Sequence, residues 1–159
     1  MRSLISVIIL PLLISCASPM PAGRDDKGEQ TVSSSKMEAQ ILDLINNYRA
    51  RKGLSKLEPN SEMDRVAARH SRSMASKAVP FGHAGFDSRY KELSGKFPGM
   101  RSMSENVAYG NLTAQKVVDL WLKSNGHRKN IEGDFNYSGI GIQADNKGQL
   151  YFTQLFMKK

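Results

Sequence analysis

Apolar side chains recur at helical spacing in three stretches of the chain. These stretches run from about residue 36 to 51, from about 61 to 79 and from about 113 to 126. Within each stretch the apolar residues lie three or four positions apart, which places them on one face of a helix. Asn60 precedes the second stretch and Thr113 precedes the third, and both residue types cap helix N-termini well. The pattern therefore predicts three amphipathic helices.

The period of the apolar residues changes to two near the C-terminus. Ile140 and Ile142 alternate with glycines, and residues 145–148 have the composition of a turn. The following segment, 150–157, is apolar at both odd and even positions, so we expect a strand that is covered on both faces. Because the helices must supply that cover, the pattern predicts an α/β protein. The expected architecture is a three-layer α-β-α sandwich with a small antiparallel sheet built on a hairpin.

Between the second and third helices, residues 80–103 are interrupted repeatedly by Gly and Pro, which predicts a long loop. An extended segment or short turn is expected at 104–110. The third helix is expected to end at Gly126, since only Gly enters the left-handed region without a Cβ clash. His127 would then lie just past a helix C-terminus, where backbone geometry holds its imidazole. His70, on the apolar face of the second helix, is expected to be a packed core histidine.

The N-terminal residues have the anatomy of a bacterial lipoprotein signal peptide. A positive charge precedes the apolar run 4–14, which is shorter than the roughly 20 residues that cross a membrane as a helix. The sequence Leu-Ile-Ser-Cys that ends at Cys16 resembles a lipobox; the alternative is an ordinary signal peptide with an incidental cysteine. We expect a signal peptide over 1–15, a lipidated Cys16 with a flexible tether over 16–36, and a folded domain over 37–159. Acyl chains would anchor the protein to a membrane of the bacterial cell envelope; the sequence does not indicate which leaflet.

Composition narrows the classes of function. A chain of 159 residues with 40 % hydrophobic residues suits one domain with its own core. The net charge of +8 favours anionic partners, such as an envelope or host component, but the basic residues are scattered and no nucleic-acid partner is expected. Because Cys16 is the only cysteine, the folded domain has no disulfide, cysteine nucleophile or thiolate metal site. Residues 139–144 match a dinucleotide fingerprint on paper, but they lead into a turn and not a helix, so we reject it.

An ordered set of short motifs resembles one known family. The set comprises His83, Glu105-Asn106, Gly126-His127-Arg128 with Asn130 two positions later, the Gly139-x-Gly141 strand and the Tyr-x-Thr-Gln-x-Phe ending. Together they resemble the CAP superfamily (cysteine-rich secretory, antigen 5 and pathogenesis-related 1 proteins) in its bacterial SCP-domain form, over about residues 38–157. No single motif is specific for this family, but the ordered set of motifs is. The resemblance implies an α-β-α sandwich, in agreement with the layers expected above.

The resemblance also implies a polar cavity, in which some family members bind a divalent metal. The positions that match the cavity are His83, Glu105 and His127, with Asn106, Arg128 and Asn130 as supporting residues. Ser124 takes the place of the family's second acidic residue, as is common in bacterial members. Two imidazoles and a carboxylate leave a fourth position open, as at a catalytic zinc site. The candidate cofactor is therefore zinc or another divalent metal, and the alternative is that the protein has none.

These residues leave several functions open. The first is a membrane-anchored envelope protein whose His/Glu/His cavity binds a divalent metal or small ligand without catalysis. The second is a metal-assisted hydrolase or peptidase that uses Glu105 and the histidines, because zinc lowers the pKa of a bound water. The third is a lipid- or sterol-binding module, which would need an apolar groove between helices. A purely structural network, in which Glu105 bonds loop amides and holds loops on the sheet, is the alternative to all three.

Overall fold

The protein is described by a computed structural model of residues 26–159, with side chains from Ser34 onward. The elements in chain order are α1 Asp26–Arg51, β1 Glu58–Pro59, α2 Ser61–Ala75, α3 Phe86–Lys96, β2 Ser102–Gly110, α4 Ala114–Lys123, α5 Asn125–Glu132, β3 Tyr137–Ala144 and β4 Leu150–Lys158. The predicted signal peptide and the lipidated Cys16 lie outside the described residues. Within the described part of the chain, no helix is both long and apolar enough to cross a bilayer.

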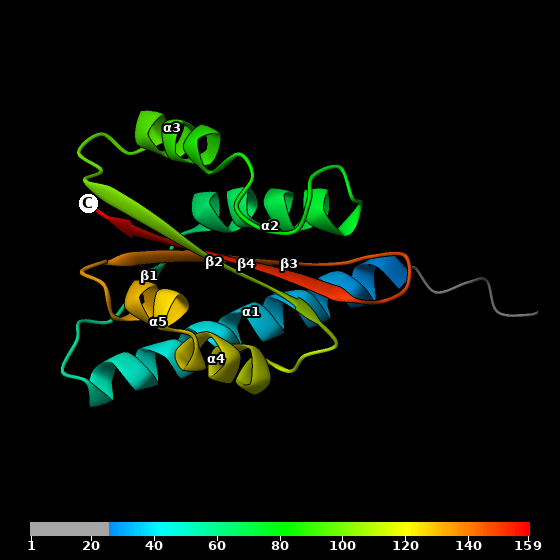
Figure 1. Cartoon of the computed structure of the whole chain (residues 1–159), viewed down its shortest axis with the longest axis horizontal. Helices are drawn as coiled ribbons and strands as arrows, with labels where there is room; N and C mark the ends of the chain where they lie inside the picture. Colours follow the sequence, from blue (N-terminus) through cyan, green and yellow to red (C-terminus); the bar gives the residue numbers. More distant parts are fainter. Residues whose placement is uncertain (1–25) are drawn as a thin grey trace, which may run out of the picture.

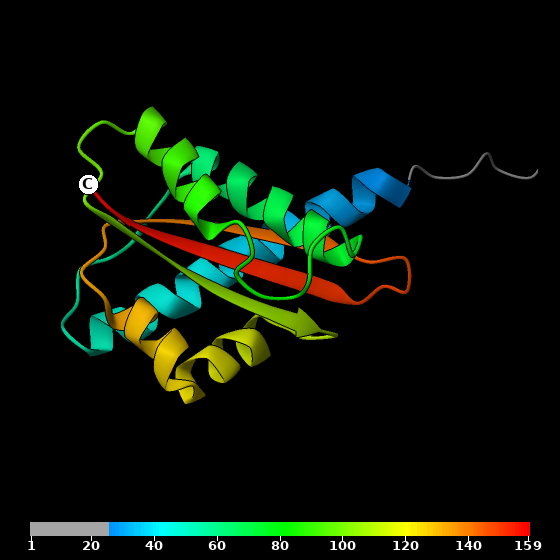
Figure 2. The same ribbon diagram turned by 45° about the horizontal axis from the view of Figure 1, so that its top comes forward.

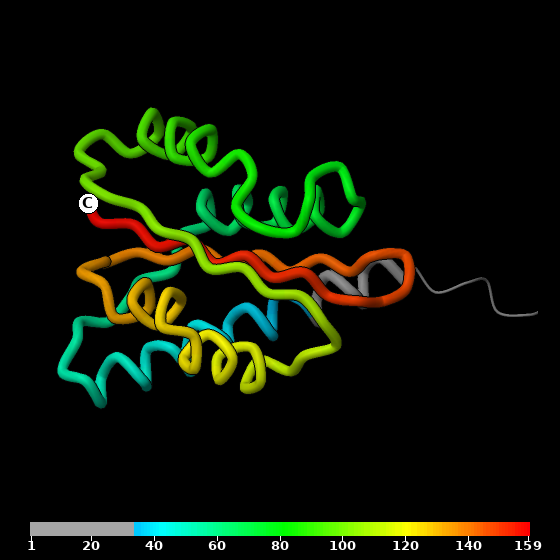
Figure 3. The backbone as a smooth tube through the Cα atoms, viewed as in Figure 1, coloured from blue at the N-terminus to red at the C-terminus, as the bar shows by residue number. Residues whose placement is uncertain are grey.

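A four-stranded sheet in the order β1-β3-β4-β2 forms the middle layer. β4 lies between β3 and β2 and is antiparallel to both, so the predicted hairpin is present (Figures 1 and 3). β1 pairs with β3 in parallel, but only at Tyr137 and Ser138. Among the described strands, β2 therefore has one unpaired edge along its length, and β3 has one beyond Ser138.

Helices cover both faces of this sheet, as predicted. α2 and α3 lie on one face, and α1, α4 and α5 lie on the other (Figures 1 and 2). Each interface has its own apolar core: Ile45, Trp121 and Phe152 are central on the side of α1, and Met63, Leu93 and Leu155 on the side of α2. The three-layer α-β-α sandwich is confirmed.

The predicted N-cap residues give the starts of α2 and α4 correctly. The side chain of Asn60 accepts a hydrogen bond from the Met63 amide at 3.1 Å, and that of Thr113 accepts one from the Lys116 amide at 3.3 Å. α1, by contrast, begins at Asp26, earlier than expected, so it includes the second half of the predicted tether. Residues 29–36 contain no Gly or Pro, and extending an existing helix fixes only one residue per added hydrogen bond.

One segment differs from the prediction and its neighbour agrees with it. The expected loop at 80–103 contains α3, whose only helix-breaking residue, Gly95, lies close to its C-terminal end. The segment at 104–110 is extended, the first of the two predicted alternatives, and forms most of β2, which pairs with β4 from Ser102 to Gly110. Apart from Gly95, the Gly and Pro residues of 80–103 therefore flank α3.

The glycines of β3 allow α2 to lie directly against the sheet. A Cβ built on Gly141 would lie 2.0 Å from the backbone nitrogen of Ala68, and one on Gly139 would lie 2.3 Å from the Cβ of Met63. No side chain fits in either space. The glycine pattern that resembles a nucleotide-binding fingerprint is thus explained by helix-to-sheet packing.

We expect Gly141→Ala to lower the free energy of unfolding by about 3 kcal/mol or more, because the new methyl group overlaps the backbone of α2. Gly95→Ala is the matched control, since a Cβ there meets nothing within 4 Å. In a helix that change should stabilise the protein by about 0.5–1 kcal/mol. Urea unfolding followed by circular dichroism measures both; equal effects would contradict the packing account.

Candidate functional site

The candidate site lies at the unpaired edge of β2, where the two helical layers meet. Glu105, in the middle of β2, points toward the layer of α2 and α3, where its carboxylate contacts His83 and Arg89. The next residue, Asn106, points to the opposite face, as successive strand residues do. There its side-chain amide donates to the backbone carbonyl of His127 at 3.2 Å. Two consecutive residues of one strand therefore connect both layers.

Arg89 of α3 holds Glu105 through a two-point ion pair. Its Nε donates to Oε2 and its Nη2 to Oε1, each at 2.8 Å. The side chains are 8 % and 1 % exposed, so the pair is buried. A guanidinium that donates two parallel hydrogen bonds to one carboxylate forms a stronger ion pair than a single contact does. Arg89 lies in the expected loop and was not among the predicted site residues. Its spacing of four from Leu93, the other buried residue of α3, is the sequence signal that points to it.

His83 is the exposed member of the group. Its Nδ1 lies 2.9 Å from Oε1 of Glu105, while the ring is 53 % exposed. Because a carboxylate only accepts, we assign a proton to Nδ1; in the neutral imidazole Nε2 then carries the lone pair and can bind a ligand. The loop that carries His83 is held over β2 by Phe81, whose ring meets that of Tyr109 edge-on with centroids 4.7 Å apart.

His70 is buried, as expected for a core histidine, and it also supports the ion pair. Its Nε2 donates to the Gly82 carbonyl at 2.8 Å, and its Nδ1 accepts from Nη1 of Arg89 at 3.1 Å. These two partners fit one neutral tautomer only. Burial, assisted by the nearby Arg89 guanidinium, holds the pKa of His70 below its usual value of 6.5. His70 therefore orients Arg89 and fixes the start of the loop that carries His83.

His127 lies in the first turn of α5, which corrects the prediction that it follows a helix C-terminus. α4 ends at Lys123, α5 begins at Asn125, and Gly126 is inside the new helix without a positive φ. The imidazole is thus at the positive end of a helix dipole, not the negative end. Burial and the nearby His83 both lower the pKa of His127.

The supporting residues build the backbone around the two histidines. The guanidinium of Arg128 donates to a carbonyl in the last turn of α4, and its amide donates to the Ser124 carbonyl at 2.8 Å. These two hydrogen bonds satisfy backbone carbonyls at the C-terminal end of α4, where a glycine cap was predicted. Asn130 donates to the Glu105 carbonyl at 3.1 Å and to the side-chain oxygen of Asn106 at 2.8 Å. Ser124 supplies a hydroxyl, not a carboxylate, between the two helices.

The predicted set of three metal ligands does not fit this geometry. Both oxygens of Glu105 are engaged by Arg89, and one of them also accepts from His83. Among residues 34–159, no three His, Cys, Asp or Glu side chains form a group that could hold a metal ion. Glu105 instead accepts a hydrogen bond from the imidazole of His83, as carboxylates do that orient a histidine without binding the metal themselves. His83 and His127 remain as the residues that could hold a cation.

One cleft between two helices bears on the lipid-binding alternative. A cleft of about 410 Å³ lies between α1 and α4. It is lined mainly by polar side chains: Gln40, Asp43, Asn47, Thr113 and Gln115, with Leu44 and Ala114. An acyl chain or sterol requires predominantly apolar walls. This cleft does not support the lipid-binding alternative.

The fold agrees with what comparison to known proteins shows. A family model described as "CAP: Cysteine-rich secretory protein family" matches residues 42–156. The chain belongs to this family. The suspected resemblance is therefore confirmed, and the matched region spans the CAP domain from the middle of α1 to the last strand.

Two relatives come from Bacillus subtilis strain 168. The uncharacterized membrane protein YlbC is 34 % identical over 138 residues, which cover 85 % of this chain and 38 % of YlbC. The uncharacterized protein YkwD is 29 % identical over 148 residues, covering 90 % of this chain and 56 % of YkwD. The chain thus spans about half the length of these relatives or less.

Solved structures show the same CAP fold. An extracellular protein containing an SCP domain from Bacillus anthracis superimposes with a TM-score of 0.71 at 27 % identity, covering 87 % of this chain and 45 % of that one. A cysteine-rich secretory protein from Staphylococcus aureus gives 0.64 at 18 % identity, with 79 % and 40 % covered. An outer surface protein from Borrelia burgdorferi gives 0.62 at 19 % identity, with 88 % and 99 % covered.

We expect Arg89→Met to lower the free energy of unfolding by about 3–5 kcal/mol, because it leaves the buried Glu105 carboxylate unpaired. The double variant Arg89→Met/Glu105→Gln should recover part of this loss, since the uncompensated charge is gone. Urea unfolding measures the three free energies.

Arg65→Met is the matched control for that experiment. Arg65 pairs with Glu62 and Glu92 on the surface, where such pairs contribute about 1 kcal/mol or less. If removing Arg89 destabilised the protein no more than removing Arg65, the claim that Arg89 neutralises a buried carboxylate would be contradicted.

The lowered pKa of His70 predicts a specific loss of stability in mild acid. As pH falls below about 6.5, His70 in the unfolded chain binds a proton that the folded protein resists, so the unfolding free energy falls. The contribution is intact above pH 6.5 and is lost as pH decreases toward the folded-state pKa. His70→Gln should show a shallower decline between about pH 7 and 5 in parallel denaturation series. Identical slopes would contradict this assignment.

Proposed function

We propose that this CAP-domain protein is an envelope-anchored binding protein in which His83 and His127 hold a divalent cation or a small ligand. The single observation that carries the proposal is the contact between Nδ1 of His83 and the buried Glu105 carboxylate. It orients an exposed imidazole with its other nitrogen free to bind. A histidine whose role was only to fill the core would not keep an exposed ring in a fixed orientation.

A cation such as zinc suits the chemistry of these residues. Imidazole nitrogen is a preferred zinc ligand, and metal-binding histidines commonly donate their second N–H to a carboxylate. Burial keeps His127 in the neutral form that binds metal, because its pKa is lowered. When bound, the cation would supply a Lewis-acid centre with further positions open to a ligand or partner.

The same geometry favours binding over hydrolysis. Catalytic zinc sites have three protein ligands and an ionisable water, and a metal-free mechanism needs a base with a free lone pair. Glu105 is committed to Arg89 through both oxygens, and Ser124 provides no second carboxylate. Glu105 is therefore not free to act as a general base, and the metal-assisted form of the hydrolase alternative lacks a third protein ligand; Nε2 of His83 is a base that this group of residues still offers.

The location in the envelope rests on the N-terminal sequence and on relatives. The Leu-Ile-Ser-Cys motif ending at Cys16 supports lipid anchoring, and relatives carry the names membrane protein, extracellular protein and outer surface protein. A net charge of +8 suits work beside an anionic surface or polymer. The proposed partners are the membrane, which the lipid anchor would enter, and an anionic component of the envelope or of a host.

Titration calorimetry with zinc tests the cation site. The wild-type chain should bind zinc, while His83→Ala and His127→Ala should each weaken binding by at least about tenfold, since each removes one ligand. Glu105→Gln should weaken it by about 10–100-fold through loss of the orienting carboxylate.

Thermal unfolding of each variant without zinc is the control, because Glu105→Gln also disturbs a buried ion pair. Zinc should raise the melting temperature of the wild-type chain and not that of His83→Ala. Equal zinc binding by the wild type and both histidine variants would rule out this site.

A further inference from the structure

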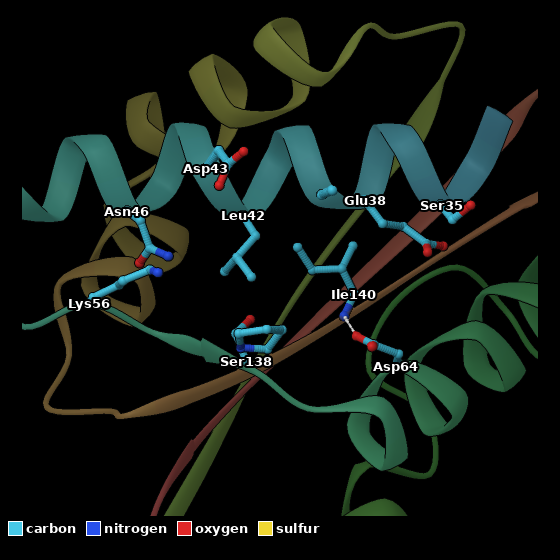
Figure 4. Close-up of a pocket in the computed structure, with 11 residues that line it drawn as sticks. Ser35, Glu38, Leu42, Asp43, Asn46, Lys56, Asp64, Ser138 and Ile140 are labelled. Atoms are coloured by element: carbon cyan, nitrogen blue, oxygen red, sulfur yellow. Dashed lines mark hydrogen bonds between the residues drawn. The ribbon is translucent and has the colours of Figure 1, made fainter. Parts of the chain in front are cut away.

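The opposite edge of the sheet borders a second concave site. β1 covers β3 only as far as Ser138, and beyond that point a groove of about 360 Å³ separates the β3 edge from α1. Its middle is apolar, with Leu42 of α1 facing Ile140 of β3 (Figure 4). This volume and mixed lining are those of a small-ligand pocket.

Two carboxylates define one end of the groove. Asp64 accepts a hydrogen bond from the Ile140 amide at 2.8 Å, and Glu38 accepts one from the Ile142 amide at 3.0 Å. These amides belong to the unpaired edge of β3, so the carboxylates also block the edge against other strands. Each carboxylate has a second oxygen, which can accept from a ligand.

Electrostatics favours a cation at this end. Burial raises the pKa of both Glu38 and Asp64, and their mutual repulsion raises that of Glu38 further. A bound ammonium group would relieve the repulsion and donate hydrogen bonds to both carboxylates. The preference is local, because the protein as a whole carries a charge of +8 and repels cations at long range.

The other end of the groove carries a basic side chain, and Asp43 of α1 is a further carboxylate in the lining. Lys56 lies there beside Asn46, away from the two carboxylates (Figure 4). Asn46 follows Glu38 by eight positions on α1, a rise of about 12 Å. An extended chain of three residues spans about 10 Å between its termini. The side chain of Asn46 is itself fixed by two hydrogen bonds to Leu57, so this end is rigid.

We infer that this groove binds the free N-terminus of a short zwitterionic peptide of about three residues. Its ammonium group contacts Glu38 and Asp64, its apolar side chains lie over Leu42 and Ile140, and its carboxylate contacts Lys56. The groove lies on the β3 edge, so its occupancy is independent of the cation site proposed on the β2 edge.

Peptide titrations on the full chain, labelled with nitrogen-15, test this inference. Trialanine should shift the amide signals of Ile140 and Ile142, the two groups that bond the carboxylates. N-acetylation of trialanine should weaken binding by at least about tenfold, since it removes a charge-assisted hydrogen-bonding group. Amidation of the C-terminus should weaken it severalfold in the wild type but not in Lys56→Met.

Glu38→Gln and Asp64→Asn are the matched variants, because their amide oxygens can still accept from the strand. Each should weaken trialanine binding by about tenfold with the melting temperature retained. Glu62→Gln changes the same charge on α2 outside the groove and should have no effect. The inference is overturned if trialanine leaves the Ile140 and Ile142 signals unmoved, if the acetylated peptide binds equally well, or if Glu62→Gln weakens binding as much as Glu38→Gln.

Discussion

The buried ion pair between Arg89 and Glu105 is the constraint on which the candidate site depends. Glu105 is almost fully enclosed, and a carboxylate without a partner in that position would be very costly. Arg89 satisfies it from α3 and also bonds His70 and the Ala84 carbonyl. The ion pair therefore fixes the position of α3, the conformation of the loop before it and the orientation of His83. One charge pair links the packing of the fold to the geometry of its most exposed imidazole.

Strands β2 and β3 share a solution to the same physical problem along their unpaired edges. A strand edge offers unpaired N–H and C=O groups to other chains, and here side chains of the helical layers take them up. On β2, Asn130 donates to the Glu105 carbonyl and the Trp121 indole donates to the Val107 carbonyl. On β3, Asp64 and Glu38 accept from the amides. Both edges thereby acquire polar side chains in fixed positions, which is why both border candidate binding sites.

The sequence predicted the elements whose signals are local. The cap residues Asn60 and Thr113, the alternation in β3 and the two apolar faces of β4 were interpreted correctly, and the order of motifs identified the family. Three features depend on tertiary contacts and could not be predicted in that way. α3 depends on the burial of Arg89 and Leu93, the break between α4 and α5 depends on Arg128, and the role of Glu105 depends on Arg89. A basic residue among many on the chain gives no sign that it will be buried.

The tautomeric states of the histidines test the account most directly. Long-range nitrogen-15 NMR of the imidazoles at about pH 8.5, where histidines of ordinary pKa are neutral, reports which ring nitrogen carries the proton. The account predicts a proton on Nδ1 in His83, where Glu105 accepts it, and on Nε2 in His70, where the Gly82 carbonyl accepts it. A proton on Nε2 of His83 would contradict the account, because Glu105 would then not orient the ring and its free nitrogen would face away from any ligand.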